Sequence, residues 1–139
     1  MRAARVGGGT GFVDSKLFWL LVENSDEPCY LVAILNAPCL KEAFAQSRES
    51  GRDFGLHPWE KVPIPRYDNQ NRHHCKLAVL CESAEEMAGQ CMRESLMDNQ
   101  KPGQVVLSAQ IRKAVFHSDV GRKINELVAK ILPDQARSS

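Results

Sequence analysis

The sequence DFGLHPWEKVPIPRYD, residues 53–68, joins an apolar first part of the chain to a long amphipathic pattern that starts NRHHCKLA. Proline holds its own φ at about −65° and biases the residue before it toward an extended conformation. Pro58 stops helical structure, and Pro63 and Pro65 impose the same restraint twice more on the segment VPIP. We therefore expect an extended connector with a fixed course, in which residues 61–64 form a short edge strand, where prolines are tolerated.

Helical patterns flank the connector on both sides. Upstream, the segment NSDEP at residues 24–28 offers caps, acidic side chains and a proline for a first turn, which predicts a helix to about Leu35. Pro38 begins a second helix, and its apolar positions share one face. These positions are Leu40, Ala43 and Phe44.

Downstream, apolar and small residues recur at spacings of three and four, which predicts three more helices. The longest follows caps at residues 68–71 and runs through Leu96. Its expected inner face consists of Leu77, Leu80, Cys81, Ala84, Ala88, Cys91 and Ser95. After a turn at Pro102 and Gly103, a short helix contains Ile111, Ala114 and Val115. Asp119 then caps a last helix whose apolar stripe is Val120, Ile124, Leu127, Val128 and Ile131.

The remaining regular element is expected at residues 17–23, which are apolar and aromatic without a helical break and are predicted as a strand. The fold class is therefore α+β, predominantly helical, with one or two short strands packed with about five helices. A chain of 139 residues suits one compact domain, expected at residues 14–133. A flexible Gly-rich segment at residues 1–13 precedes it, and a tail at 134–139 follows.

Charge is spread unevenly, although the net charge is only +1. Residues 48–76 carry six Lys or Arg against four Asp or Glu, and residues 112–139 carry six against three. This mild basicity is compatible with a DNA-facing side, but it is far below that of proteins that bind nucleic acid by charge alone.

The five cysteines form no CxxC pair, and their odd number argues against a disulfide framework. The longest apolar run, at residues 17–22, is too short to span a bilayer, and no secretory segment is found. We therefore expect a cytoplasmic protein, without membrane contact, whose thiols are reduced and structural.

Four groups of residues resemble motifs of one bacterial family. They are Lys16, Leu17, Phe18 and Trp19; Tyr30 to Pro38; His57, Trp59, Pro63, Ile64, Pro65 and Asp68; and His74, Leu77, Ala78 and Leu80. In this order they resemble the KLYW, YYLxAILNSP, HxxWxxPIPxxD and HxxLAxL segments of the C-terminal, target-recognition region of N-6 adenine DNA methyltransferases. These enzymes are type IIG-like proteins of restriction-modification systems, and the likeness spans roughly residues 11–132.

The resemblance implies a piece without the catalytic part. In the family, a separate domain binds S-adenosylmethionine in a Gly-rich loop and presents the flipped adenine to an Asn/Asp-Pro-Pro-Tyr motif. This chain contains no NPPY, DPPY or SPPY. The implied function is a non-catalytic recognition module without a cofactor, which acts with a separate catalytic subunit or is cut from it. The alternative is a protein-interaction module that docks a partner through the acidic long helix and the amphipathic last helix.

A contact surface for duplex DNA is predicted on the connector. Four cations, Arg52, Lys61, Arg66 and Arg72, are concentrated in 21 residues around the proline-stiffened loop. Such side chains bind phosphates or base edges, although each of them is also typical of an ordinary solvated position. His57 and Trp59 are predicted to anchor the loop by packing. So few charges neutralise few phosphates, and binding by the chain alone is expected to be weak.

Three other candidate sites have weaker support. The glycines of residues 7–11 lack the preceding strand and following helix of a phosphate-binding loop. His73, His74 and Cys75 are neighbours on a helix, point about 100° apart and cannot close one metal site. Cys75 with His57 is a conceivable nucleophile pair, but neither shows the surroundings of an activated thiol. No catalytic residue and no metal ligand is therefore predicted.

Overall fold

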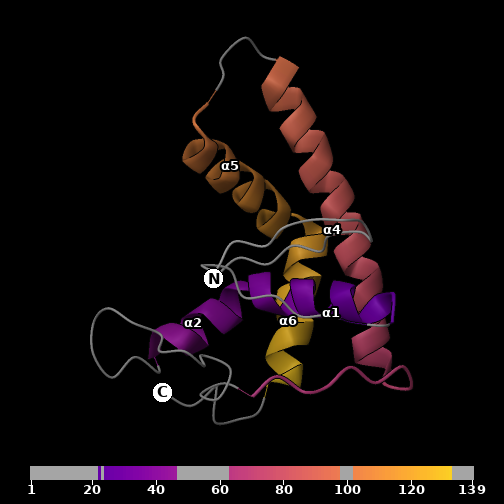
Figure 1. The fold of residues 1–139 in the computed structure, drawn as a ribbon. Coiled ribbons are helices and arrows are strands. Elements are labelled where there is room, and N and C mark those ends of the chain that lie inside the picture. Colours follow the sequence, from indigo (N-terminus) through magenta and orange to yellow (C-terminus); the bar gives the residue numbers. More distant parts are fainter. Residues whose placement is uncertain (1–21, 23, 47–62, 98–101, 133–139) are drawn as a thin grey trace.

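Helices make up most of the computed structural model of this chain, which describes residues 22, 24–46, 63–97 and 102–132. The helices are α1 (Asp26–Asn36), α2 (Pro38–Gln46), α4 (Arg72–Met97), α5 (Gln104–His117) and α6 (Asp119–Ile131). Figure 1 shows α1 crossing the lower part of α4 and α6, while the upper part of α4 extends beyond this crossing with α5 beside it. The prediction of a predominantly helical fold is confirmed.

The predicted strands are not observed in the described part of the chain. Val22, Pro63 and Ile64 belong neither to a helix nor to a strand. Proline has no N–H to donate to a ladder, and side chains from neighbouring helices hold this segment instead. The rest of the strand expected at residues 17–23 lies outside the described residues, as do the Gly-rich segment at 1–13 and the tail at 134–139.

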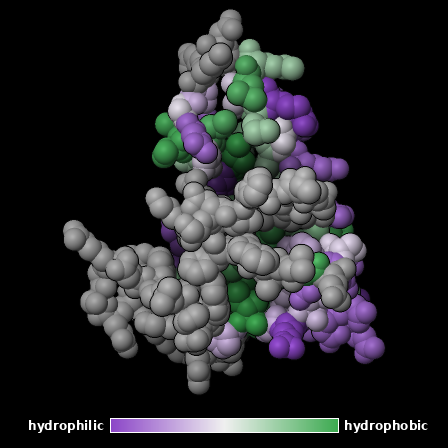
Figure 2. Space-filling view, viewed as in Figure 1, coloured by the Kyte–Doolittle hydropathy of each residue, from purple (hydrophilic) through white to green (hydrophobic). Residues whose placement is uncertain are grey.

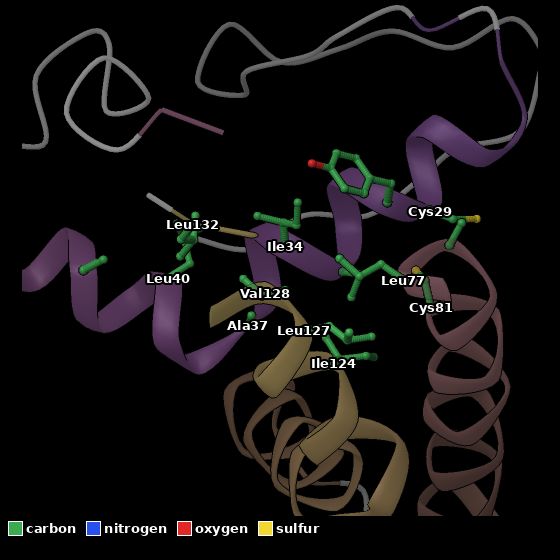
Figure 3. Close-up of a cluster of buried hydrophobic side chains, with 14 of the residues drawn as sticks. Cys29, Ile34, Ala37, Leu40, Leu77, Cys81, Ile124, Leu127, Val128 and Leu132 are labelled. Carbon is green, nitrogen blue, oxygen red and sulfur yellow. The ribbon is translucent and has the colours of Figure 1, made fainter. Parts of the chain in front are cut away.

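One hydrophobic core joins α1, α2, the start of α4 and α6. Figure 3 shows Leu77 and Cys81 of α4 beside residues of α1 and α6. The core residues with less than a tenth of their surface exposed are Cys29, Tyr30, Ala33, Ile34, Ala37, Leu40, Ala43, Phe44, Leu77, Ala78, Cys81, Ile124, Leu127, Val128 and Leu132. Val120 and Ile131 are partly buried against it, so the predicted stripe of the last helix faces the core.

The long helix α4 is buried over only its first ten residues. Its buried side chains are His74, Leu77, Ala78 and Cys81, and none of residues 82–97 is buried. The predicted inner face is therefore correct through Ala84, which packs against the core. Cys91, expected as a small core residue, is instead half-buried outside the core.

This difference divides the described chain into two regions. We call residues 26–46, 63–81 and 115–132 the base, and residues 82–97 and 102–114 the arm. No residue of the arm is buried, and large apolar side chains on it are exposed. These are Met92, Leu96, Met97, Val105 and Val106. Figure 2 shows apolar side chains on the surface at the upper end of the molecule, where Figure 1 places the arm. No helix in the described residues is long and apolar enough to cross a membrane.

Local polar bonds set where α4 and α6 begin. The Asn71 side chain accepts a hydrogen bond from the His73 amide at 2.9 Å, so Asn71 caps α4. Asp68 accepts from the Gln70 amide at 2.8 Å and stabilises the preceding turn. Ser118 caps α6 by accepting from the Gly121 amide at 3.2 Å. The predicted cap, Asp119, is instead the first residue of that helix.

Candidate nucleic-acid interface at the start of α4

The end of the connector is attached to the base by a buried tyrosine. The Tyr30 hydroxyl, on α1, donates a hydrogen bond to the Pro65 carbonyl at 2.9 Å. Tyr30 is fully buried, and this burial raises the pKa of its phenol to about 12, so it stays neutral and able to donate. The two neighbouring side chains of the connector, Ile64 and Tyr67, pack against the core from outside.

An aromatic cluster joins three segments that are distant in sequence. The Tyr30 ring lies 4.6 Å from the His74 ring and 5.4 Å from the Tyr67 ring, centroid to centroid. Tilted contacts at these separations are favourable for aromatic pairs. Tyr30 belongs to α1, Tyr67 to the connector and His74 to α4, so this cluster fixes the turn between Tyr67 and Asn71 relative to both helices.

His74 holds the same turn by a polar bond. The Asp68 amide donates to His74 Nδ1 at 3.0 Å, which requires a neutral imidazole with its proton on Nε2. Burial lowers the pKa of His74, the Asp68 carboxylate raises it, and the electrostatic interaction with His73 lowers it further. Because burial is the largest of these effects, the environment favours the neutral form that the bond needs.

Tyr67 and Cys75 complete the polar contacts of the turn. The Cys75 thiol donates to the Asn69 carbonyl at 3.2 Å, and its sulfur lies 3.9 Å from the Tyr67 hydroxyl. The Tyr67 hydroxyl also lies 3.5 Å from an Asp26 carboxylate oxygen. Partial burial, followed by these contacts with Cys75 and Asp26, raises the pKa of Tyr67 to about 12. The contacts of Cys75 are those of a structural thiol, and its conceivable partner His57 lies outside the described residues.

Two of the four residues predicted to contact DNA lie on either side of this turn. Arg66 and Arg72 are exposed, one before the Tyr67–Asn71 turn and one at the first position of α4. Lys76, which the sequence analysis did not single out, is exposed one helical turn after Arg72 and therefore on the same side of α4. Lys76 could have been predicted as part of this surface, because it follows Arg72 by four residues in a predicted helix. Arg52, Lys61, His57 and Trp59 lie outside the described residues.

The predicted separation of the two adjacent histidines is confirmed. His73 is exposed, whereas His74 is buried, so the two rings do not converge on one ligand. Across the described ranges, 22, 24–46, 63–97 and 102–132, no three His, Cys, Asp or Glu side chains are grouped so as to hold a metal ion.

Arg112 contacts other parts of the protein and is therefore less available to a ligand than Arg66 and Arg72. Arg112, on α5, donates to the Asn36 carbonyl at 3.0 Å and lies 5.4 Å from the centre of the Phe116 ring. It therefore contacts the carbonyl of the last residue of α1. With Pro38, Lys41, Glu42 and Ala45 it lines an open depression between α2 and α5. The presence of Glu42 there and the use of Arg112 in packing give this depression little attraction for an anion.

Comparison with known proteins does not assign the chain to a family. A scan against protein-family models and searches of curated proteins and solved structures found no match to the chain.

Proposed function

We propose that this chain is a non-catalytic DNA-recognition or C-terminal module of a bacterial restriction-modification adenine methyltransferase. It acts in the cytoplasm with a separate catalytic part, or is cut from it, and methyl transfer belongs to that other part. The observation that carries the proposal is the exposure of Arg66 and Arg72 on either side of a turn whose backbone is fixed by buried side chains.

The motif residues support the proposal because they form one unit. Three of the four resembling groups contribute to it: Tyr30 from the first helix, Pro65 from the connector and His74 from the long helix. These groups are far apart in sequence, yet they meet around the turn that carries the arginines. Residues of the resembling motifs are therefore in contact with each other in the fold.

The geometry suits contact with the phosphate backbone. The backbone that carries these cations is already fixed, so binding orders less of the chain than it would on a flexible loop. The positive end of the α4 dipole lies at the same turn and favours an anion there. Acidic residues also lie nearby, Asp26 and Asp68, which limits the number of phosphates that this surface can neutralise. Binding by the isolated chain should therefore be weak.

A salt titration of duplex binding tests this. Fluorescence anisotropy with a labelled duplex should show affinity falling with salt, with a slope of about 0.9 for each phosphate contacted. The double variant Arg66→Ala/Arg72→Ala should bind more weakly and reduce that slope by about 2, if each arginine contacts one phosphate. Both residues are exposed, so the variant should fold.

The matched control removes the same charge from the arm. Arg93→Ala/Lys113→Ala also deletes two exposed cations, one on α4 and one on α5. It should keep the parent slope if binding is located at the turn. Equal losses in the two double variants would show that only net charge matters. No duplex binding at low salt would contradict the proposal outright.

The second candidate is a protein-interaction module, and the exposed apolar side chains of the arm favour it. Two docking surfaces were expected, the last helix and the long helix. The apolar stripe of α6 already packs into the base, so in this hypothesis the exposed part of α4 and the rest of the arm dock the partner. The catalytic subunit of a methyltransferase, added to the chain in sedimentation experiments, should then form a complex. Leu96→Gln/Met97→Gln should weaken that complex, whereas the arginine variant should not.

A further inference from the structure

We propose that His74 is an acid-sensitive latch, whose neutral imidazole holds the Tyr67–Asn71 turn against α1 and α4 and whose protonation releases the turn. The inference concerns the fold and holds whether or not the turn contacts DNA.

The hydrogen bond at the centre of the latch works in one protonation state only. His74 Nδ1 accepts from the Asp68 amide at 3.0 Å. An imidazolium carries a proton on both nitrogens and has no acceptor left. Protonation therefore replaces an attractive contact by two N–H groups that face each other, and the turn must move away from α4 to relieve this.

The surroundings of His74 leave the cation poorly solvated. Only 4% of the residue surface is exposed, and the Tyr30 ring packs on it at 4.6 Å. A charge taken out of water without a partner is costly. The hydroxyl of Tyr30 does not relieve this cost, because it is already bonded to Pro65.

The charged and titratable groups around His74 come from all three segments that meet there. They are Asp26 and Tyr30 on α1, Tyr67 and Asp68 on the connector, and His73 and Cys75 on α4. The two tyrosines are neutral below about pH 10, since the pKa of each is raised to about 12. The Asp68 carboxylate favours the imidazolium, while His73 and burial oppose it, and burial is the largest effect.

The sign of the pH dependence follows from this balance. The pKa of His74 is lowered from 6.5 in the closed turn, so the released turn binds a proton more readily than the closed one. The latch is therefore at full strength above about pH 6.5, the ordinary histidine value, and weakens as the pH falls below it. For one proton, the closed-to-released ratio falls at most about tenfold for each pH unit.

Release should be local, because other attachments do not depend on His74. The Tyr30 bond to Pro65 and the Asn71 cap of α4 both remain when the imidazole is charged. The hydrophobic core of the base also remains, so the acid-released form keeps its helices. Local openings of this kind are detected by the exchange of individual amide hydrogens.

The Asp68 amide reports on the latch directly. Its hydrogen exchange, corrected for the intrinsic effect of pH, should be measured by NMR beside the titration of the His74 imidazole. We expect His74 to titrate below about 6.5, and the protection of the Asp68 amide to fall in the same range, by up to about tenfold for each pH unit. Protection that stays constant while His74 titrates would overturn the proposal, and so would an imidazole that titrates at or above the ordinary value.

A variant separates the charge from the hydrogen bond. In His74→Asn, the side-chain oxygen stands close to the position of Nδ1 and accepts from the Asp68 amide at any pH. This variant should keep the amide protected in acid, whereas the control His117→Asn, at the end of α5, should behave as the parent does. Loss of protection in His74→Asn at the same acid pH as in the parent would contradict the latch. If that variant does not fold, the measurement on the parent still decides.

Discussion

The base and the arm share the helices α4 and α5, yet they differ in what their side chains contact. In α4 the first ten residues contribute four buried side chains, and the following sixteen contribute none. In α5 the one buried residue is Val115, near its end. The arm exposes Met97 with 83% of its surface accessible and Val105 with 75%, while Leu77 of the base is fully buried. Regular helical structure thus continues beyond the part of each helix whose side chains are buried.

This contrast explains what the motif residues do. The described members of the resembling groups, from Tyr30 to Leu80, all lie in the base, and most of them are buried or partly buried. Such residues build the fold around the turn, and the positions between them, Arg66 and Arg72, are exposed. A motif of this kind identifies a scaffold more directly than it identifies a binding residue.

Adding one methyl group at a glycine compares how tightly the two regions are packed, and the largest change in the free energy of unfolding is expected in the base. A Cβ at Gly121 would lie 2.5 Å from Phe116 Cα and 2.9 Å from the Val115 carbonyl carbon, so α5 and α6 would have to separate. Gly121→Ala should therefore lower the free energy of unfolding by about 3 kcal/mol, because the backbone of α5 itself would have to move. Urea unfolding followed by circular dichroism measures this.

The matched change in the arm should have the opposite sign. At Gly89 the nearest atom to an added Cβ is 3.5 Å away, on the flexible Arg93 side chain. Alanine is the better helix former, and Gly89→Ala should raise the free energy of unfolding by about 0.5–1 kcal/mol. If both variants are destabilised alike, the arm is packed as tightly as the base and the comparison is wrong.

Leucine truncation compares burial in the two halves of one helix. Leu77→Ala removes a fully buried side chain from the core and should cost about 3 kcal/mol. Leu96→Ala removes a side chain that is 57% exposed, and should change the free energy of unfolding by no more than about 0.5 kcal/mol. Thermal or urea unfolding of both variants provides the test. A large loss for Leu96→Ala would mean that the arm has a covered apolar face.

Much of the helical framework could be predicted from the sequence. The long helix was expected to follow caps at residues 68–71 and to run through Leu96, and it spans Arg72–Met97. Such boundaries depend on caps and prolines, which act locally. The partial burial of α4 could not be predicted, because Ala88 and Cys91 continue the same series of three- and four-residue spacings that contains Leu77 and Cys81. Periodicity shows which face is apolar, but only tertiary structure shows where a partner helix covers it.

The candidate site was predictable to a similar extent. The exposure of Arg66 and Arg72 was expected and is confirmed. Caps were predicted at residues 68–71; within this range Asn71 caps the helix, and Asp68 shapes the turn before it. The hydrogen bond from the Asp68 amide to His74 was not predicted. It depends on the way the connector returns to the start of α4, and on the burial of His74 under Tyr30, which no local pattern encodes.

Removal of one hydroxyl group tests whether the connector belongs to the base. Tyr30→Phe keeps the ring in the core and removes the hydroxyl bonded to Pro65, so it should cost about 1 kcal/mol at neutral pH. Tyr67→Phe is the control and should cost less, because the Tyr67 hydroxyl lies as far as 3.5 Å from Asp26. Equal, negligible losses in both variants would mean that the connector is held by its apolar contacts alone.

The loss of stability at alkaline pH provides a second test of the environment of Tyr30. The pKa of Tyr30 is raised from 10.0 to about 12, so the folded state disfavours ionisation. Its contribution to stability is complete below pH 10 and is lost as the pH rises toward 12, with a total of about 2–3 kcal/mol at about 1.4 kcal/mol per pKa unit. Tyr30→Phe should lack this part of the decline. Cys39, whose pKa burial raises to about 11, contributes equally in both proteins, so the difference between their pH profiles isolates Tyr30. Parallel profiles from pH 9 to 12 would show that the Tyr30 hydroxyl is in contact with water and that the connector is not anchored through it.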